Sequence, residues 1–278
     1  MSGIPHPVLG LVLALVVGFV LGLLGGGGSI LALPIFLYVF LVPVKPAIAM
    51  SLVVVGMSAL IGFVSHWRQG TVALRIALPF GAFAMLGAYV TARLAHRVPA
   101  QLQLGLFGAF AVTAAVLMLR DSLRPDRAGA AVAADGGSGA AAPAAPAAPA
   151  APAMRRFGVG LALQAVAVGA LTSLIGAGGG FVIVPALVLL AHVPVRQAVG
   201  SSLLIIAMNA MSGFVGYLGQ VPIAWRLVGS FTGVAAVGAL VGTRLVPHVP
   251  QARIKQGFAV MILVLGAYFA LRKLAMVP

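Results

Sequence analysis

The chain of 278 residues contains no cysteine and no glutamate, and its three acidic residues are Asp121, Asp126 and Asp135. Without cysteine the protein forms no disulfide and offers no thiolate as a nucleophile or as a metal ligand. Charged residues make up only 7% of the sequence, against roughly 25% in a typical soluble domain. These absences exclude an ordinary water-soluble enzyme, because too few polar side chains remain to cover a globule.

Apolar residues make up 62% of the chain, and its mean hydropathy is +1.16. They form two groups of long runs, at 8–24, 29–42, 46–65, 72–92 and 101–119, and at 157–175, 180–192, 197–218, 223–243 and 254–271. The 17 lysines and arginines stand mostly singly or in pairs between these runs. That distribution is typical of loops in a membrane protein and unlike the clustered basic face of a nucleic-acid-binding protein. We therefore expect an all-α polytopic protein with about eight transmembrane helices, embedded in the lipid bilayer of the cell (inner or plasma) membrane, with no nucleic-acid partner.

Residues 124–153 separate the two groups of runs and contain the repeat APAAPAAPAAPA. A proline at every third position prevents a helix and favours an extended, semi-rigid segment. The sequence therefore divides into a first transmembrane repeat at 1–123, an Ala/Pro/Gly-rich linker at 124–153 and a second transmembrane repeat at 154–278. The linker is expected to be a spacer, with a docking site as the alternative.

The two groups of runs are copies of one another, because residues 22–99 align with residues 173–250 without a gap. The matched pairs, each 151 positions apart, include Gly25 and Gly176, Pro34 and Pro185, Ser51 and Ser202, Gln69 and Gln220, Arg75 and Arg226, and Arg93 and Arg244. Two pseudo-symmetric repeats are a common plan of secondary transporters. Halves that each cross the membrane an odd number of times would be inverted, and halves that cross it four times would be parallel. The distribution of cations slightly favours the inverted arrangement with a cytoplasmic linker.

The first repeat opens with an apolar stretch, residues 8–41, that is too long for one membrane span. As a single helix it would be about 51 Å long at 1.5 Å per residue, whereas the hydrocarbon core is about 30 Å thick. Runs of small residues at 25–29 and at 176–180 predict that a helix breaks there in each repeat. Unwound backbone inside a membrane must be buried in protein or line a watery cavity.

The backbone amides freed at each break, together with the positive end of the helix that follows, predict a site for a small anion. Ser29 is a candidate N-cap of the helix after the first break. The alternative is that the glycines only allow close helix packing. The predicted substrate-binding residues at the breaks are Gly25, Gly26, Gly27, Gly28, Ser29, Gly176, Gly178, Gly179 and Gly180.

The segments GLLGGGGS…P at 22–34 and SLIGAGGG…P at 173–185 resemble the sulfite exporter TauE/SafE family of membrane transporters. The serines at 51 and at 201–202, which follow the two VPV turns, also fit the family, so the likeness covers nearly all of the chain except the linker. The resemblance implies an eight-helix bundle that moves sulfur-containing or carboxylate anions, such as sulfite, sulfoacetate or related organosulfonates. The long Ala-Pro linker is a departure from the family pattern.

Polar residues inside the apolar runs are further candidates for contact with the substrate. Ser51 and Ser202 match across the repeat, and Asn209 lies two helical turns after Ser202, so these two share a face of one helix. They are expected to line the cavity, with hydrogen bonding inside the helix bundle as the alternative. Arg75 and Arg226 are candidates for attracting the anion into a vestibule, against the simpler account of snorkelling to the headgroups.

The missing carboxylates also bear on the mechanism, because an embedded Asp or Glu would repel an anion. No metal site or other cofactor is expected, since no histidine and carboxylate stand at metal-ligand spacing. No enzymatic activity is predicted either, because a serine enzyme would need a histidine deep in the bundle and the histidines stand near the ends of the runs. The predicted protein is a transporter, a permease or exporter, that carries small anions by alternating access at the paired breaks. The alternatives are a non-transporting membrane anchor or assembly subunit, and an anion channel.

Overall fold

The computed structural model describes residues 7–24, 31–70, 72–122, 158–176, 183, 184, 187, 193 and 195–245. These residues form helices and the turns between them, and no strand occurs among them. The helices are α1 (Pro7–Leu24), α2 (Ala32–Tyr38), α3 (Val44–Arg68), α4 (Leu74–Leu94), α5 (Ala100–Ser122), α7 (Val159–Ile175), α9 (Val195–Tyr217) and α10 (Trp225–Leu245), with a short 3₁₀ helix, η2 (Ala95–Arg97), after α4. The prediction of an all-α bundle of about eight helices is confirmed.

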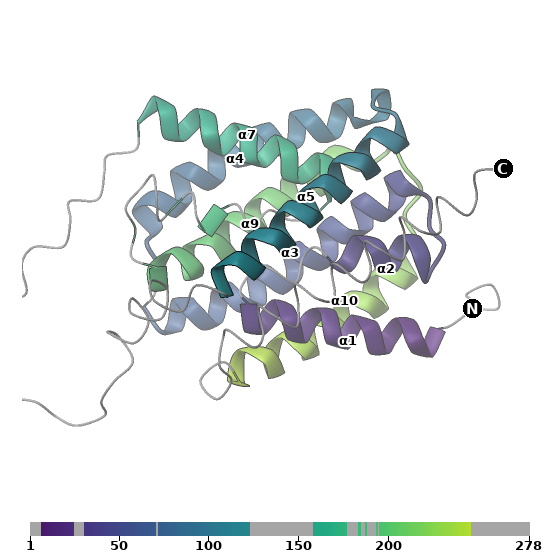
Figure 1. Ribbon diagram of the computed structural model, residues 1–278, viewed down its shortest axis with the longest axis horizontal. Helices are drawn as coiled ribbons and strands as arrows, with labels where there is room; N and C mark the ends of the chain where they lie inside the picture. Colours follow the sequence, from purple (N-terminus) through teal and green to yellow (C-terminus); the bar gives the residue numbers. More distant parts are fainter. Residues whose placement is uncertain are drawn as a thin grey trace, which may run out of the picture.

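The lengths and outer faces of the helices suit a bilayer. The helices that are long and apolar enough to cross a membrane are Val44–Arg68, Leu74–Arg97, Gln197–Tyr217 and Trp225–Gly242. Shorter apolar stretches lie in α1, α5 and α7, and the long helices all run roughly from one side of the view to the other (Figure 1). Exposed side chains on the outside include Val12, Leu86 and Val237. An apolar outer face on spans of this length is what the hydrocarbon core requires, so the protein is a multi-pass membrane protein.

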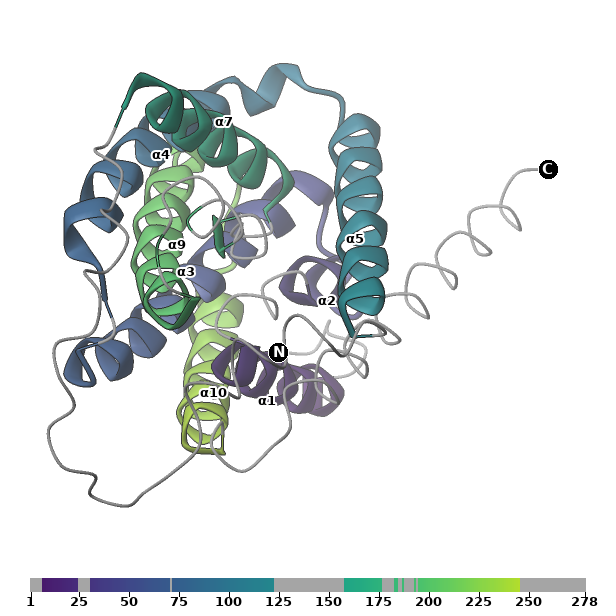
Figure 2. The same cartoon turned by 60° about the vertical axis from the view of Figure 1, so that its left-hand side comes forward.

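The middle of the bundle is formed by α3 and α9, with α1, α4, α5 and α7 around them (Figure 2). The two central helices are antiparallel. A Cβ atom added to Gly56 would lie 3.3 Å from the Cβ of Ala210, and one added to Gly62, further along α3, would lie 3.2 Å from Cδ1 of Leu203, further back along α9. Glycine at these positions lets the two helix backbones approach closely, as small residues do in membrane bundles.

The outer helices pair across the sequence, α1 with α10 and α7 with α4, through glycines that meet backbone atoms. A Cβ atom on Gly18 would lie 2.6 Å from the carbonyl carbon of Ala235, and one on Gly169 would lie 2.7 Å from that of Ala84. Two further close approaches join the same helices, Gly238 against Leu15 and Gly87 against Val166. The contacts of the two helix pairs correspond under the 151-residue offset: Gly18 matches Gly169, and Ala84 matches Ala235. The other two contacts correspond in the same way.

One described helix, α7, ends at Ile175, where the second glycine run begins, and α1 is described up to Leu24, the residue before the first run. Gly176 caps α7 in the left-handed conformation, with φ of 75°, and donates its N–H to the carbonyl of Thr172 at 2.9 Å. Glycine adopts this conformation without the steric cost that other residues incur. The other residues predicted at the breaks, Gly25, Gly26, Gly27, Gly28, Ser29, Gly178, Gly179 and Gly180, lie outside the described residues.

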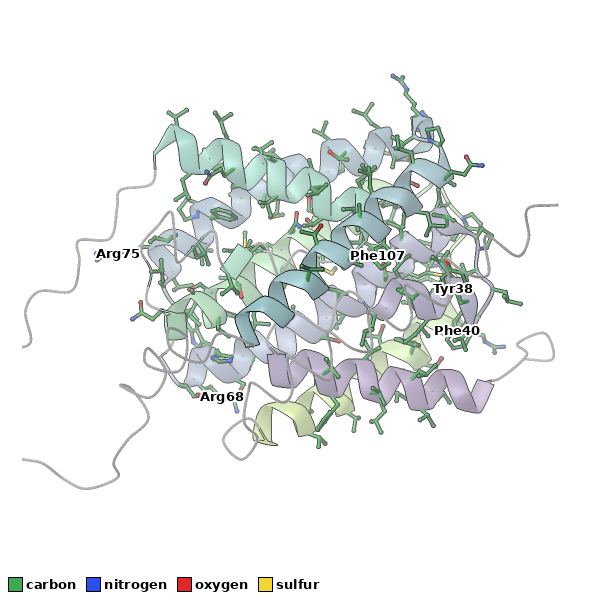
Figure 3. The ribbon with its side chains drawn as sticks, viewed as in Figure 1. Tyr38, Phe40, Arg68, Arg75 and Phe107 are labelled. Atoms are coloured by element: carbon green, nitrogen blue, oxygen red, sulfur yellow. The ribbon has the colours of Figure 1, made fainter. Side chains whose placement is uncertain are left out.

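The helix after the first break, α2, is shorter than the apolar run at 29–42 predicts, because the chain turns at residues 39–43. Aromatic contacts fix α2 against α10: the ring centroids of Phe36 and Phe231 are 4.8 Å apart, and those of Phe40 and Phe231 are 6.0 Å apart. Figure 3 shows Tyr38 and Phe40 together at this end of α2. The first half of the chain is thus packed directly on a helix of the second half.

Candidate functional site

The second glycine run is anchored by a serine from the first half of the chain. Ser51, in α3, is fully buried. Its hydroxyl oxygen lies 2.8 Å from the carbonyl oxygen of Ile48, in its own helix, and 2.9 Å from that of Gly176, so these two acceptors share its one proton. A Cβ atom on Gly176 would lie 2.8 Å from the Ser51 oxygen, so the contact itself requires glycine at this position.

The last turn of α7 adds two buried polar side chains beside this contact, Thr172 and Ser173, and α9 adds a third, Asn209. The hydroxyl of Thr172 donates to the carbonyl of Val168 at 2.8 Å and accepts a hydrogen bond from the side-chain amide of Asn209 in α9. Ser173 packs against α9 at Gly213, where an added Cβ atom would lie 2.6 Å from the serine oxygen. We call Ser51, Thr172, Ser173, Gly176 and Asn209 the α7 cluster.

Two polar atoms of the α7 cluster have no hydrogen-bond partner although they are buried: the hydroxyl oxygen of Ser173 and Oδ1 of Asn209. Buried polar groups in proteins are almost always hydrogen-bonded, and an unpartnered one costs about 1–3 kcal/mol. A hydroxyl that can donate and an amide oxygen that can accept are therefore left without a protein partner. No aspartate or glutamate occurs among the residues whose side chains the structure describes.

Thr172 and Ser173 are functional candidates that the sequence analysis did not single out. Both are polar, and both stand directly before a glycine run at the end of an otherwise apolar stretch, which is the signal that could have identified them. Neither has a polar counterpart in the first repeat, because the matching residues are Leu21 and Gly22. A comparison of the two repeats therefore does not identify Thr172 and Ser173 as candidates.

The two matched serines make the same hydrogen bond within their own helices. Ser202 is fully buried like Ser51, and its hydroxyl donates to the carbonyl of Val199 at 2.8 Å, as that of Ser51 does to Ile48. The residue that matches Gly176 in the first repeat is Gly25, which lies outside the described residues. Asn209 and Ser51 are thus brought together at the α7 cluster, whereas Ser202 lies two turns away along α9.

Arg75 and Arg226 lie at opposite ends of the bundle, in the first turns of α4 and α10. Both side chains are exposed, and Figure 3 shows Arg75 at the end where Arg68 closes α3. Since α3 and α9 are antiparallel and α10 follows α9 after a short turn, Arg226 is at the other end. Neither arginine belongs to the buried cluster, so any contact with an anion would be made at the surface.

Comparison with known proteins gives a consistent result. The chain matches the family described as sulfite exporter TauE/SafE over residues 10–269. It is 34% identical over 236 residues, 82% of each chain, to a probable membrane transporter protein of Xylella fastidiosa (strain Temecula1). It is 23% identical over 239 residues, 86% of this chain and 89% of the relative, to the probable membrane transporter protein YdhB of Bacillus subtilis. The probable membrane transporter protein MJ0441 of Methanocaldococcus jannaschii is 27% identical over 222 residues, 74% of this chain and 72% of the relative. No solved structure gives a significant match.

Proposed function

The chain belongs to the sulfite exporter TauE/SafE family of membrane transporters, and from this premise we propose that it carries small anions, such as sulfite, organosulfonates or related carboxylates. The observation that supports this most strongly is the α7 cluster, in which Ser173 and Asn209 keep unpartnered polar atoms beside a glycine run. Polar groups inside a membrane bundle are costly and mark the path of a solute by default.

In this proposal the anion binds between the α7 cluster and the backbone amides of Gly178, Gly179 and Gly180. The amides and the hydroxyl of Ser173 donate to its oxygens, as unwound backbone does in transporters with broken helices. Ser51 acts indirectly. Its hydroxyl lies within hydrogen-bond distance of the carbonyl of Gly176. This carbonyl is at the negative end of the α7 dipole and would repel an anion if it had no donor.

The second binding element in this proposal is the first break, residues 25–29, with Ser202 in the role that Ser51 has at the second. Two inverted repeats, 1–123 and 154–278, would place these breaks on either side of a pseudo-two-fold axis. Two observations support the inverted relation: α3 and α9, which begin at the matched residues Val44 and Val195, are antiparallel, and the close glycine contacts recur at an offset of 151 residues. Alternating access would then follow when the repeats exchange conformations.

Replacement of Gly27 or Gly178 by leucine tests the role of the breaks. A leucine side chain at either position would fill the space next to the backbone amides, so we expect loss of anion uptake in proteoliposomes while the protein still inserts and elutes as the parent does. Gly160→Leu is the matched control, since an added Cβ atom there meets nothing within 4 Å. Unchanged uptake by the Gly27 and Gly178 variants would overturn the proposal.

The same assay separates a carrier from the other functions that the sequence allows. A carrier gives saturable uptake that is stimulated by substrate on the far side of the membrane, because the loaded site returns faster. A channel gives uptake that rises with concentration and is not stimulated in this way. A membrane anchor or assembly subunit gives no uptake.

A further inference from the structure

One face of α9 carries polar or small residues from the α7 cluster to the end of the helix. Asn209, Gly213 and Tyr217 follow one another at spacings of four residues, which places them on one side of the helix. Gln220 comes next in the row, because its side-chain amide bonds back to the carbonyl of Gly216 in α9. Tyr217 is the last residue of α9, and Gln220 lies in the turn that follows. This row begins in the middle of the bundle and ends at its surface.

Buried polar atoms without a hydrogen-bond partner occur at each level of this row. At the α7 cluster the atom is Oδ1 of Asn209, at the helix end it is the hydroxyl of Tyr217, and in the turn it is Oε1 of Gln220. Gln103, from the first turn of α5, lies close enough to the Tyr217 hydroxyl to interact with it, but the polar atoms of this pair have no well-aligned hydrogen bond. Tyr217 and Gln103 are 1% and 0% exposed, so neither obtains its partners from the outer surface.

The row ends at an open surface cavity of about 450 Å³, whose described lining residues are Arg93, His96 and Gln220, with the arginine and the histidine exposed. The Arg93 guanidinium lies over the Tyr89 ring, 5.8 Å from its centroid. The ring of His96 is oriented by a hydrogen bond from Nδ1 to the carbonyl of Arg93 at 2.8 Å, which leaves Nε2 for another partner. The side-chain amide of Gln220 donates to the carbonyl of Gly216 at 2.7 Å, so its orientation is also fixed.

The surroundings of this cavity are positively charged. Lys45 donates to the backbone carbonyl of His96 at 2.8 Å, and Arg97 follows His96 in η2. Aspartate and glutamate are absent from the part of the chain whose side chains the structure describes. An arginine that lines a cavity with no described carboxylate beside it is a binding group for an oxyanion.

Two of the three lining residues also recur in the duplication. Arg93 matches Arg244 and Gln220 matches Gln69, whereas His96 matches Pro247. Arg244 lies in the last turn of α10 and Gln69 directly follows α3, so the second pair stands at helix ends equivalent to those of Arg93 and Gln220. The arginine and the glutamine are thus present at both equivalent positions, and the histidine is present only at the cavity of Arg93 and Gln220.

We propose that the cavity lined by Arg93, His96 and Gln220 is an outer oxyanion-binding site, connected to the α7 cluster through Tyr217 and Gln103. The planar guanidinium of Arg93 binds two oxygens of the ligand, and His96 Nε2 accepts from a protonated oxygen or hydroxyl. The ligand class is a small sulfur or phosphorus oxyanion, either free in solution or as the phosphate of a lipid headgroup. The connection to the α7 cluster rests on the proposed function, whereas the outer site does not.

The natural absence of cysteine allows this proposal to be tested with single cysteines in the full chain. Gln220→Cys, reconstituted in phosphatidylcholine liposomes, is labelled with a negatively charged methanethiosulfonate reagent and with a positively charged one of similar size. We expect the anionic reagent to react roughly tenfold faster, because a cationic cleft concentrates anions. This preference should disappear when Arg93→Gln is added. Arg97→Gln is the matched control and should keep it, because Arg97 does not line the cavity.

The connection to the bundle interior is tested at Tyr217. Tyr217→Cys should react with the anionic reagent from the same side of the membrane as Gln220→Cys, and more slowly. Met211→Cys, half a turn from Asn209 on the outward face of α9 and 39% exposed, should not react with either membrane-impermeant reagent, because that face meets lipid. An unreactive Tyr217→Cys beside a reactive Gln220→Cys would overturn the connection.

Two additions distinguish the sources of the oxyanion. Free methanesulfonate should slow the labelling of Gln220→Cys if the site takes a soluble anion, and phosphatidylglycerol in the liposomes should slow it if the site takes a headgroup. Slowing by neither, or equal rates for the two reagents with Arg93 in place, would overturn the outer site. Each variant is first compared with the parent by gel filtration, so that misfolding is recognised. Labelling needs no transport, so a failed uptake assay would overturn the proposed function and leave this result standing.

Discussion

Replacement of Gly169 by alanine should loosen the contact between α7 and α4. The added Cβ atom would lie 2.7 Å from the carbonyl carbon of Ala84 and 2.8 Å from its Cα, whereas non-bonded carbon atoms prefer a separation of about 3.5–4.0 Å. Both neighbours are backbone atoms, so no side-chain rotation relieves the overlap, and the helices must separate by roughly 1 Å. Overpacking of this kind costs about 1–3 kcal/mol.

The assay for this prediction is thermal stability in detergent, measured as the temperature at which half of the protein remains monodisperse on gel filtration. Gly160→Ala is the matched control in the same helix, because nothing lies within 4 Å of its added Cβ atom. It should be neutral or slightly stabilising, since alanine favours a helix over glycine by about 1 kcal/mol. Gly18→Ala, at the matched contact with Ala235, should behave like Gly169→Ala. If Gly169→Ala melts at the same temperature as Gly160→Ala, the reasoning about backbone contact is refuted.

Two further substitutions probe the α7 cluster. Asn209→Asp introduces a carboxylate, which at a separation of about 6 Å and an effective dielectric constant of about 20 repels a bound anion by about 2.8 kcal/mol, or roughly 100-fold in affinity. Initial uptake rates at low substrate concentration measure this loss of affinity. Rates within twofold of the parent would contradict the prediction. Ser51→Ala leaves the carbonyl of Gly176 buried without its donor, which should lower the free energy of unfolding by about 1–3 kcal/mol. Ser58→Ala is its control, because the Ser58 hydroxyl is buried in the same helix without a partner, and equal destabilisation of both variants would refute the assigned role.

The end of α7 was predictable because it depends on local chemistry. Successive glycines disfavour a helix because each loses much backbone entropy in it. In the structure α7 ends at Ile175, and Gly176 adopts the left-handed conformation that glycine tolerates. The sequence also shows directly that the apolar runs contain no carboxylate. It left two arrangements of the repeats open, inverted and parallel. The contact of Gly169 with Ala84 was not predictable, because residues far apart in sequence are brought together only by the three-dimensional arrangement of the helices.

The polar residues that escaped prediction share one property. Thr172, Ser173, Gln103 and Tyr217 match Leu21, Gly22, Ile254 and His66 in the other repeat, so comparison of the repeats gives them no support. Their roles come from packing between helices: Ser173 against Gly213, and Gln103 against Tyr217. Ser51 and Ser202 illustrate the converse, since these matched serines both donate to the carbonyl three residues earlier in their own helix, Ile48 and Val199.

Uptake by proteoliposomes containing the purified protein tests the central claim most directly. The panel comprises sulfite, sulfoacetate, sulfate and small carboxylates, each measured against protein-free liposomes and with the same anion preloaded inside. The account predicts saturable uptake of at least one sulfur oxyanion, sulfonate or carboxylate that accelerates with preloading and is lost in Gly178→Leu. Uptake no faster than in protein-free liposomes for every anion, or uptake that rises linearly with concentration and ignores preloading, would contradict it.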